Sequence, residues 1–356
     1  MRYHRNNWEV GSEFHLIIDD SFYTVTEEKF WQPSIVFTGS GRDAIRLILR
    51  MGRNVFKWKR AFVPSYLCPE VIRTIKEEIP ELKIYYDDPE EAVNPPTPNS
   101  NEVLFLVNTF GIRPRWHIGH DFAGQIIEDH THDPWSEHAK ESSADYCFAS
   151  LRKTLPVADG AIIWSPKGLS LPKQPKLSTT HHLAASLKLN AMIIKSLYLN
   201  GYAGQKDEYL NDFREGEAHI TSRRVSNLIP ASEYIIKSFD VEKWRSLRLS
   251  NYLFLLKELG NYDGINVLKP SSKAACPFSF IVVFDSNNTR EKMRMELIRS
   301  NIFPAVLWDL DIQIQKLYKS NQNLSSRMLS IHCDGRYSTD DQLQVAEIIK
   351  RLLKKV

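Results

Sequence analysis

This 356-residue chain lacks paired cysteines, a signal peptide and a membrane-spanning apolar run. Its four cysteines lie far apart and form no CxxC pair, which predicts a reducing compartment and no structural zinc site. The first residues lack the apolar segment of a signal peptide, and no apolar run is long enough to span a bilayer. The sequence therefore predicts a cytoplasmic protein without membrane association.

The sequence also has no segment in which charges of one sign are concentrated. The 46 Lys and Arg residues against 43 Asp and Glu give a net charge of +3, scattered along the chain, which argues against a nucleic-acid-binding surface. With 42% hydrophobic and 25% charged residues, the composition is that of a globular protein whose length allows two domains. Internal repeats and low-complexity tracts are absent from the sequence.

Short apolar runs alternate with amphipathic segments in the first half of the chain. Helices are predicted over 42–52 and 69–79, the first after a strand that ends near Phe37. Further strands are predicted over 60–67, 82–88, 102–111, 124–130, 144–151 and 160–165. This alternation predicts an α/β fold with a mostly parallel sheet flanked by helices, in which polar residues at the carboxyl ends of strands meet in one crevice.

The second half has a different character. Helical patterns extend over 181–202 and 233–260, and a strand-helix-strand-strand-helix block follows. Its segments are 277–285, 289–301, 303–308, 327–334 and 339–356, the last capped by Thr339 or Asp340. We expect a large α/β domain over 1–230 and a smaller α+β domain over 231–356, with the N-terminal segment packing on the smaller domain.

Two side chains draw attention because each follows a predicted strand. Lys153 closes an S-x-x-K sequence that starts at Ser150, and Asp129 ends the apolar run of 124–130. Pyridoxal phosphate chemistry needs such a pair: an amine that bonds to the cofactor aldehyde, and a carboxylate that keeps the pyridine nitrogen protonated. Alone, each has a plainer explanation, as a snorkelling lysine and a turn aspartate. Asn108 also follows a strand and is expected to converge with them.

The segment from Phe37 to Leu49 predicts an anion site at a helix N-terminus. Ser40 can cap the helix, the backbone amides of Gly41 and Arg42 would point outward, and the Arg42 side chain adds a charged donor. An ordinary capped helix explains the same residues.

Other candidates have equally plain alternatives. Tyr66 and Cys68 lie in a strand-to-helix loop, where a flat or polarisable side chain could cover one face of a cofactor ring, or simply pack in the loop. Arg224, beside Arg223, could clamp a phosphate or carboxylate across a dimer interface, or be solvated.

Three histidines follow the strand that ends in Asp129. His132 could form a hydrogen bond to the phenolic oxygen of the cofactor. The spacing of His130, His132 and His138 fits neither a zinc finger nor an HExxH site, so no metal is predicted.

These motifs, taken in chain order, resemble one family of enzymes. SGRDAI, VPSYLCPEVI, VNTFG, IIEDHTHD and FASLRKTLPVADGA are similar to segments of the DegT/DnrJ/EryC1/StrS group, fold-type I pyridoxal-phosphate enzymes of the aspartate aminotransferase superfamily. The resemblance covers roughly residues 34–165. It departs from the family pattern at Arg42, where a threonine is usual, at Phe148, where a serine is frequent, and in the reduced Gly-rich stretch after the lysine.

The resemblance implies a role for each matching residue. Lys153 would bond covalently to the cofactor, Asp129 would pair with the pyridine nitrogen, and His132 would contact the ring oxygen. The backbone at Gly41 and Arg42 would bind the phosphate. Cys68 stands where the family often has a stacking aromatic, a role that Tyr66 could take, and Arg224 lies near a position that reaches the neighbouring subunit's cofactor.

The predicted function is therefore a pyridoxal-phosphate-dependent aminotransferase acting as a homodimer with shared active sites. An amino acid such as glutamate would be the donor, and a keto compound the acceptor, with a nucleotide-linked sugar as one candidate. Two alternatives remain open: another pyridoxal phosphate reaction, of the dehydratase, decarboxylase or aldolase type, and a binding protein of this fold without catalysis.

Overall fold

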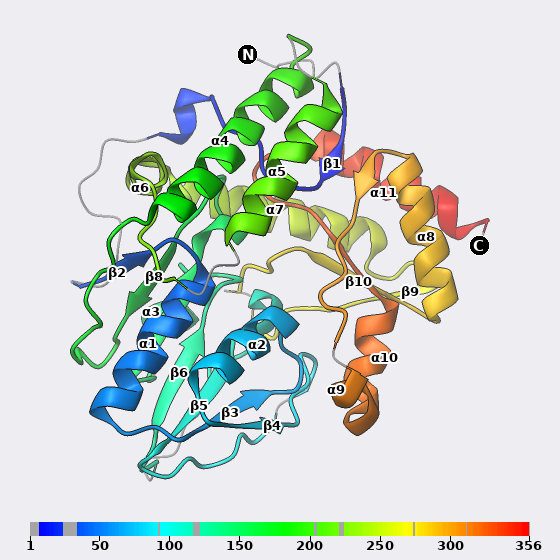
Figure 1. The fold of residues 1–356 in the computed structure, drawn as a ribbon. Helices are drawn as coiled ribbons and strands as arrows, with labels where there is room; N and C mark the ends of the chain where they lie inside the picture. The colour runs from blue at the N-terminus through cyan, green and yellow to red at the C-terminus, as the bar shows by residue number, and fades with distance from the viewer. Residues whose placement is uncertain are drawn as a thin grey trace.

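The structure, a computed structural model, describes residues 7–23, 34–91, 93–116, 122–202, 205–220, 224–272, 275–310 and 312–355. Its main element is a seven-stranded sheet in the order β2-β8-β7-β6-β5-β3-β4 (Figure 1). The strands are β2 (Val36–Thr38), β3 (Arg60–Pro64), β4 (Glu81–Tyr85), β5 (Glu102–Val107), β6 (Gln125–Asp129), β7 (Tyr146–Ser150) and β8 (Ala161–Trp164). Each overlaps a segment that the sequence predicts as a strand or, for β2, the predicted strand end near Phe37.

The predicted, mostly parallel sheet is confirmed. Strands β3 to β7 pair in parallel, whereas β8 is antiparallel to both of its neighbours, β7 and β2. A parallel pair needs a long crossover connection, but β7 and β8 are joined by a short loop with one 3-10 turn, η3 (Leu151–Lys153). This loop holds Lys153 at the carboxyl end of β7.

Helices cover the large sheet on both faces. On one face α1 (Gly41–Val55) and α2 (Pro69–Glu78) lie side by side, as Figure 1 shows, and share a core with Ile127 and Phe148. Ile126 and Cys147, one residue earlier on the same strands, point into a second core on the opposite face. The short α3 (Glu137–Lys140) contributes Ala139 to that second core.

The middle of the chain is helical. It forms α4 (Thr179–Leu199), α5 (Lys206–Ile220), α6 (Pro230–Ser238) and α7 (Val241–Leu259). The helical pattern predicted over 233–260 is confirmed as two helices. Helix α6 ends at Ser238, and the Asp240 side chain starts α7 by accepting a hydrogen bond from the backbone N–H of Lys243 at 3.0 Å. The sequence did not predict α5, which is rich in charged residues.

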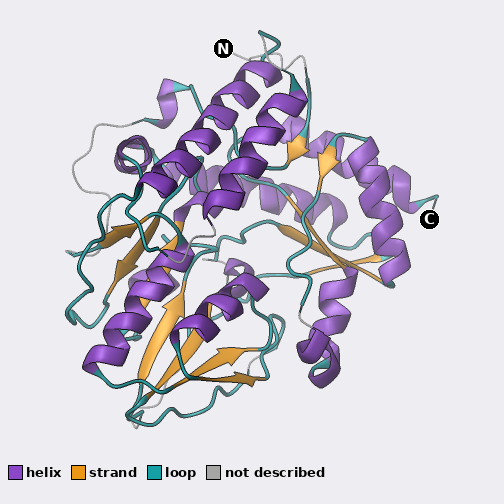
Figure 2. Cartoon of the chain, viewed as in Figure 1, coloured by secondary structure: helices purple, strands orange, loops and turns teal. Residues whose placement is uncertain are grey.

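The C-terminal part has its own sheet, flanked by helices (Figure 2). Its elements are β9 (Ile265–Val267), β10 (Phe280–Phe284), α8 (Asn287–Arg299), β11 (Ile302–Phe303), α9 (Ile312–Leu317), α10 (Lys319–Arg327), β12 (Met328–Ile331) and α11 (Thr339–Leu353). Strands β12, β10 and β9 pair antiparallel in that order and pack against α7, α8 and α11.

Two predictions for this part need correction. The strand expected over 303–308 is reduced to the two residues of β11 because the chain continues in irregular structure. The cap of α11 is Ser338, not Thr339 or Asp340: its hydroxyl accepts the Asp341 N–H, and the Asp341 carboxylate accepts the Ser338 N–H in return.

The N-terminal segment lies against this C-terminal part. Strand β1 (Val10–Gly11) pairs in parallel with β11, and a 3-10 turn, η1 (Asp20–Phe22), follows it. The boundary between domains at residue 230 stays a prediction. Among the described residues, every helix is too short or too polar to cross a membrane.

Gly52 offers a test of how α1 packs. A methyl group at this position would lie 1.9 Å from a ring carbon of the buried Trp58, whose indole N–H donates to Gln125 at 2.7 Å. Gly52→Ala gains about 1 kcal/mol of helix propensity but incurs an overpacking cost of about 1–3 kcal/mol or more, so we expect net destabilisation in urea unfolding. Gly52→Ala combined with Trp58→Leu should cost less than the sum of the single changes, and additivity would rule out the steric explanation.

Candidate active site

The register of three parallel strands brings the predicted polar residues together. Val107 is paired with Asp129, so β5 and β6 end at one level, and Asp129 is paired with Phe148, two residues before β7 ends at Ser150. Asn108 follows β5 directly, and its backbone N–H donates to the Asp129 carbonyl at 2.9 Å. Ligands of α/β sheets bind at this carboxyl edge.

Backbone hydrogen bonds fix the turn that presents Lys153. The Leu151 N–H donates to the Gly160 carbonyl at 3.0 Å, and the Thr154 N–H to the Leu151 carbonyl at 3.0 Å. Leu151 is fully buried and anchors the turn, whereas the Lys153 side chain is only half-buried. Gly160 has a φ of +117°, which a residue with a side chain adopts at a cost, so glycine suits the far end of this loop.

A cavity of about 450 Å³ opens beside Lys153. Three parts of the chain line it: the N-terminal segment, the carboxyl edge of the large sheet, and the C-terminal part. The lining residues are Ser12, Glu13, Phe14, His132, Arg152, Lys153, Phe278, Phe303, Pro304, Ala305, Leu307, Ser330 and His332. Both the size and the mixture of an apolar wall with a few polar groups are typical of small-molecule sites.

Asp129 and His132 are both within electrostatic reach of Lys153. Burial raises the pKa of Asp129, and this is opposed by a hydrogen bond from the Thr131 N–H and by the positive charge of Lys153. Burial, together with the smaller effect of the Lys153 charge, lowers the pKa of His132 to about 3. His132 is therefore neutral, and because its Nδ1 accepts the Phe110 N–H at 3.0 Å, the proton is on Nε2.

Aromatic rings form a layer around His132. Trp308 and Phe278 pack on its imidazole with centroid separations of 5.8 and 4.8 Å, and Phe110 stacks on Trp308 at 6.2 Å. The Trp308 centroid lies 5.8 Å from Lys153 Nζ. Tyr66 lies behind this layer, with its ring edge-on to Phe110 and its hydroxyl donating to the Leu307 carbonyl at 2.5 Å, and does not line the cavity.

The start of α1 approaches the turn before Lys153 closely. Ser40 caps α1 by accepting the Asp43 N–H at 3.2 Å, and its carbonyl accepts the Ala44 N–H at 3.0 Å. The first amides of a helix, here those of Gly41 and Arg42, have no partner within it. A methyl group on Gly41 would lie 3.1 Å from the Ser150 Cβ, so glycine keeps these two segments in contact.

The Arg42 side chain forms ion pairs with two glutamates and is therefore not available as a phosphate ligand. Its guanidinium pairs with Glu217 at 3.4 Å and with Glu70 at 3.7 Å. The Glu217 carboxylate also accepts two hydrogen bonds of 3.0 Å from the Arg152 guanidinium and forms an ion pair with Lys188 at 2.7 Å. Burial by itself would raise the pKa of Glu217, but these cations hold this pKa well below its ordinary value.

Of the predicted site residues, only His132 and Lys153 are among those that line the cavity. Cys68 is half-buried and directly precedes Pro69, the first residue of α2, without capping that helix through its side chain. Arg224 is exposed between α5 and α6 and is not a lining residue. Sequence analysis in turn missed Glu13, Phe278 and Trp308, because nothing in their local pattern signals a site and only the fold brings them near Lys153.

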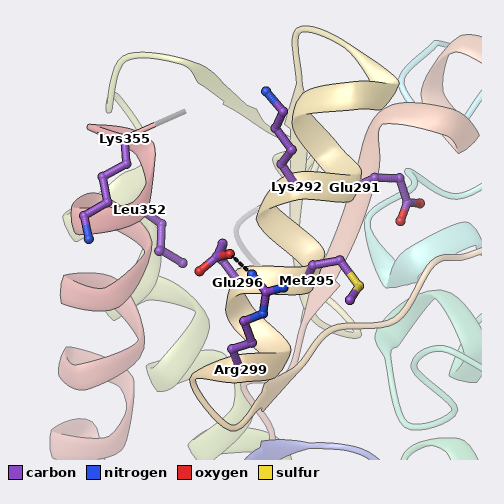
Figure 3. A pocket seen from close by; sticks show the side chains of 7 residues that line it. All are labelled: Glu291, Lys292, Met295, Glu296, Arg299, Leu352 and Lys355. Carbon is purple, nitrogen blue, oxygen red and sulfur yellow. Dashed lines mark hydrogen bonds and ion pairs between the residues drawn. The ribbon is translucent and has the colours of Figure 1, made fainter.

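A second hollow, of about 580 Å³, lies between α8 and α11 (Figure 3). Its wall is a helix surface of charged side chains, such as Glu296 paired with Arg299, around Met295 and Leu352. It holds none of the residues predicted for catalysis.

No protein-family model matches this sequence, and no curated protein does. Solved structures do match. The aminotransferase PseC of Helicobacter pylori, involved in the biosynthesis of pseudoaminic acid, is 10% identical with a TM-score of 0.63 over 98% of this chain and 100% of its own. The putative sugar aminotransferase Spr1654 of Streptococcus pneumoniae, in its PMP form, is 12% identical with a TM-score of 0.62 over 98% of each chain. A DegT DnrJ EryC1 StrS aminotransferase from Brucella abortus is 14% identical with a TM-score of 0.59 over 89% of this chain and 85% of its own.

The chain has the fold of these aminotransferases. The predicted fold-type I architecture is thereby confirmed over nearly the whole chain, beyond the stretch from 34 to 165 that carries the sequence resemblance.

Because His132 is neutral in the folded state, we expect it to make the stability of the cofactor-free protein depend on pH. The pKa of His132 falls from 6.5 to about 3 on folding, so the unfolded chain binds the extra proton and stability declines as the pH falls from about 6.5 towards 3. His132→Gln keeps an acceptor for the Phe110 N–H and should flatten this decline, measured by urea unfolding between pH 7.5 and about 5. The exposed His182→Gln is the control, and equal pH dependence in all three proteins would contradict a buried neutral His132.

Proposed function

We propose that this protein is a pyridoxal-phosphate-dependent aminotransferase of the DegT/DnrJ/EryC1/StrS type. The observation that carries this proposal is the position of Lys153: it lines a cavity at the carboxyl edge of the large sheet, with Asp129 and His132 within its electrostatic reach, in a chain with this fold.

The residues present suit pyridoxal phosphate. Lys153 would hold the aldehyde carbon, and Asp129 the pyridine nitrogen, whose positive charge offsets the cost of burying this carboxylate. The amides of Gly41 and Arg42 and the hydroxyl of Ser150 would hold the phosphate. Asn108 and Thr109 each have a buried side-chain oxygen without a hydrogen-bond partner among the described residues, as expected where a polar ligand completes the site.

When bound, the cofactor supplies an electron sink for the bond broken at the substrate carbon. Asp129 keeps the ring nitrogen protonated, which maintains that sink. The Lys153 amine would act as the general base and acid that takes the proton from the substrate Cα and delivers it to the cofactor carbon C4′. His132 donates from Nε2, which orients the ring, and the aromatic layer of Phe110, Phe278 and Trp308 limits access of water.

The acceptor is a keto compound of the sugar class, with an amino acid such as glutamate as donor. This rests on the similar structures, which include sugar aminotransferases from Streptococcus pneumoniae and Micromonospora echinospora. The cavity is compatible with it, since one wall, from Phe303 to Leu307, is mainly apolar and the opposite side carries Glu13 and Arg152. A cofactor spectrum that changes with glutamate distinguishes transamination from binding alone, and product analysis distinguishes it from the dehydratase, decarboxylase and aldolase alternatives.

The enzyme acts as a homodimer in the cytoplasm, and Arg224 reaches the cofactor phosphate of the neighbouring subunit. The exposure of Arg224 outside its own cavity supports this role. Light scattering should give a dimer at micromolar concentration, and a fully active monomer would contradict shared sites.

The covalent role of Lys153 can be tested by trapping. Borohydride reduction of the cofactor-loaded protein followed by peptide mapping should leave the pyridoxyl label on Lys153, and Lys153→Arg should abolish it. Lys188 is the matched control, since burial lowers its pKa and it lies in the same network around Glu217. A label on Lys188 or any other lysine refutes the assignment.

Asp129 is tested by Asp129→Asn. The amide oxygen can still accept the Thr131 N–H that now lies 2.8 Å from the carboxylate, so the fold should be kept. Loss of the charge-assisted bond to the ring nitrogen should cost a few kcal/mol, or about 10² to 10³ in kcat, while the cofactor still binds. Stopped-flow rates with glutamate measure the effect, and near-normal turnover would remove Asp129 from the mechanism.

A further inference from the structure

A second group of reactive side chains lies on the other face of the strand that carries Asp129. Glu128 and Cys147 are paired across β6 and β7, and His130 follows two residues after Glu128. Since side chains alternate along a strand, these three point away from Asp129, into the core behind the cavity. All three are buried, as is His138 on α3, which packs against them.

The distances between these side chains suit one shared ion. One ligand atom each from Glu128, His130 and Cys147 lies within 4.8 Å of the others. Glu128 Oε2 and His130 Nε2 are 3.2 Å apart, and two ligands bound at about 2.0–2.1 Å in tetrahedral geometry are separated by about 3.3 Å. His138 Nε2 forms a hydrogen bond of 2.7 Å with Glu128 Oε1, which orients this carboxylate.

Three ring nitrogens of these two histidines have no hydrogen-bond partner within the described chain. Within the described chain, neither ring nitrogen of the fully buried His130 has a hydrogen-bond partner, although Nε2 is close to the carboxylate. The Nδ1 of His138 also has none. Leaving such groups unsatisfied costs about 1–3 kcal/mol each, and a bound ion is one of the recognised remedies.

The surroundings resemble the outer shell of a metal site. Ser142 Oγ donates to Glu128 Oε2 and lies 3.4 Å from the Cys147 Sγ, so one hydroxyl touches two of the ligands. Trp164 lies beside His130 with a ring-centroid distance of 5.7 Å and keeps this region apolar. Hydrogen-bonded carboxylate ligands and a hydrophobic shell are typical of sites that hold their metal firmly.

We propose that Glu128, His130 and Cys147 bind one divalent transition metal ion, of which zinc fits this mixture of oxygen, nitrogen and sulfur ligands best. The site is structural: its three ligands are buried and come from β6, the residue after it and β7, and His138 of α3 supports it through the hydrogen bond to Glu128. Binding releases the Cys147 thiol proton to solvent, so the thiolate is the ligand. The spacing of the three histidines gave no indication of this site because Cys147 comes from the neighbouring strand and His132 faces the opposite way.

The site is tested on the full chain produced in medium supplemented with zinc, and separately with cobalt, then dialysed against a chelator. About one zinc ion per chain should remain by elemental analysis, and the cobalt protein should show a thiolate-to-metal charge-transfer band. Cys147→Ala should lose the band and most of the metal, whereas Cys333→Ala, at another buried cysteine, should keep both.

A folded wild-type protein that retains no metal after either growth would overturn the proposal, as would equal metal content in Cys147→Ala and Cys333→Ala. Should Cys147→Ala fail to fold, the wild-type cobalt spectrum decides, since a site without the thiolate gives no charge-transfer band. None of these readouts depends on pyridoxal phosphate or on catalysis.

Discussion

The register in which β5, β6 and β7 are paired is the constraint on which the site depends. Pairing of Val107 with Asp129 and of Asp129 with Phe148 places Asn108, Asp129 and the turn of Lys153 along one edge. A shift of β6 by one residue would move Asp129 to the other face and put Glu128 in its place. The buried apolar residues on both faces, Ile126 and Ile127 among them, oppose such a shift because each would then leave its own core.

The alternation of side chains along β6 places the cavity and the proposed metal site on opposite faces of the large sheet. Asp129 faces the cavity side, where burial raises its pKa and a cationic ring would compensate its charge. Glu128 faces the opposite core; burial there would raise its pKa, but His130 and His138 hold it well below its ordinary value. Two neighbouring carboxylates thus have opposite environments, so each needs its own positive partner, and a partner for one cannot serve the other.

The sequence revealed the parts of this site that are local to a strand end. Asp129 and Lys153 follow apolar runs, and Ser40 precedes a helix, so pattern alone was enough to single them out. It could not reveal the cavity walls Glu13 and Phe278, or Trp308 beside Lys153, because tertiary packing brings them together. The same limit applies to Glu217: Arg152 lies 65 residues away in sequence, and α5, which carries Glu217, lacks the apolar periodicity by which a helix is recognised.

Sequence identity of 10–14% with structures of the same fold is consistent with these constraints. Strand register, side-chain alternation and core volume can be satisfied by many apolar residues, so the positions that fill a core are free to change. A lysine after β7 and an acid at the end of β6 are not replaceable in the same way if the chemistry is kept. In this chain the strand register supplies that requirement, because it places Asp129 and the turn of Lys153 along one edge of the sheet.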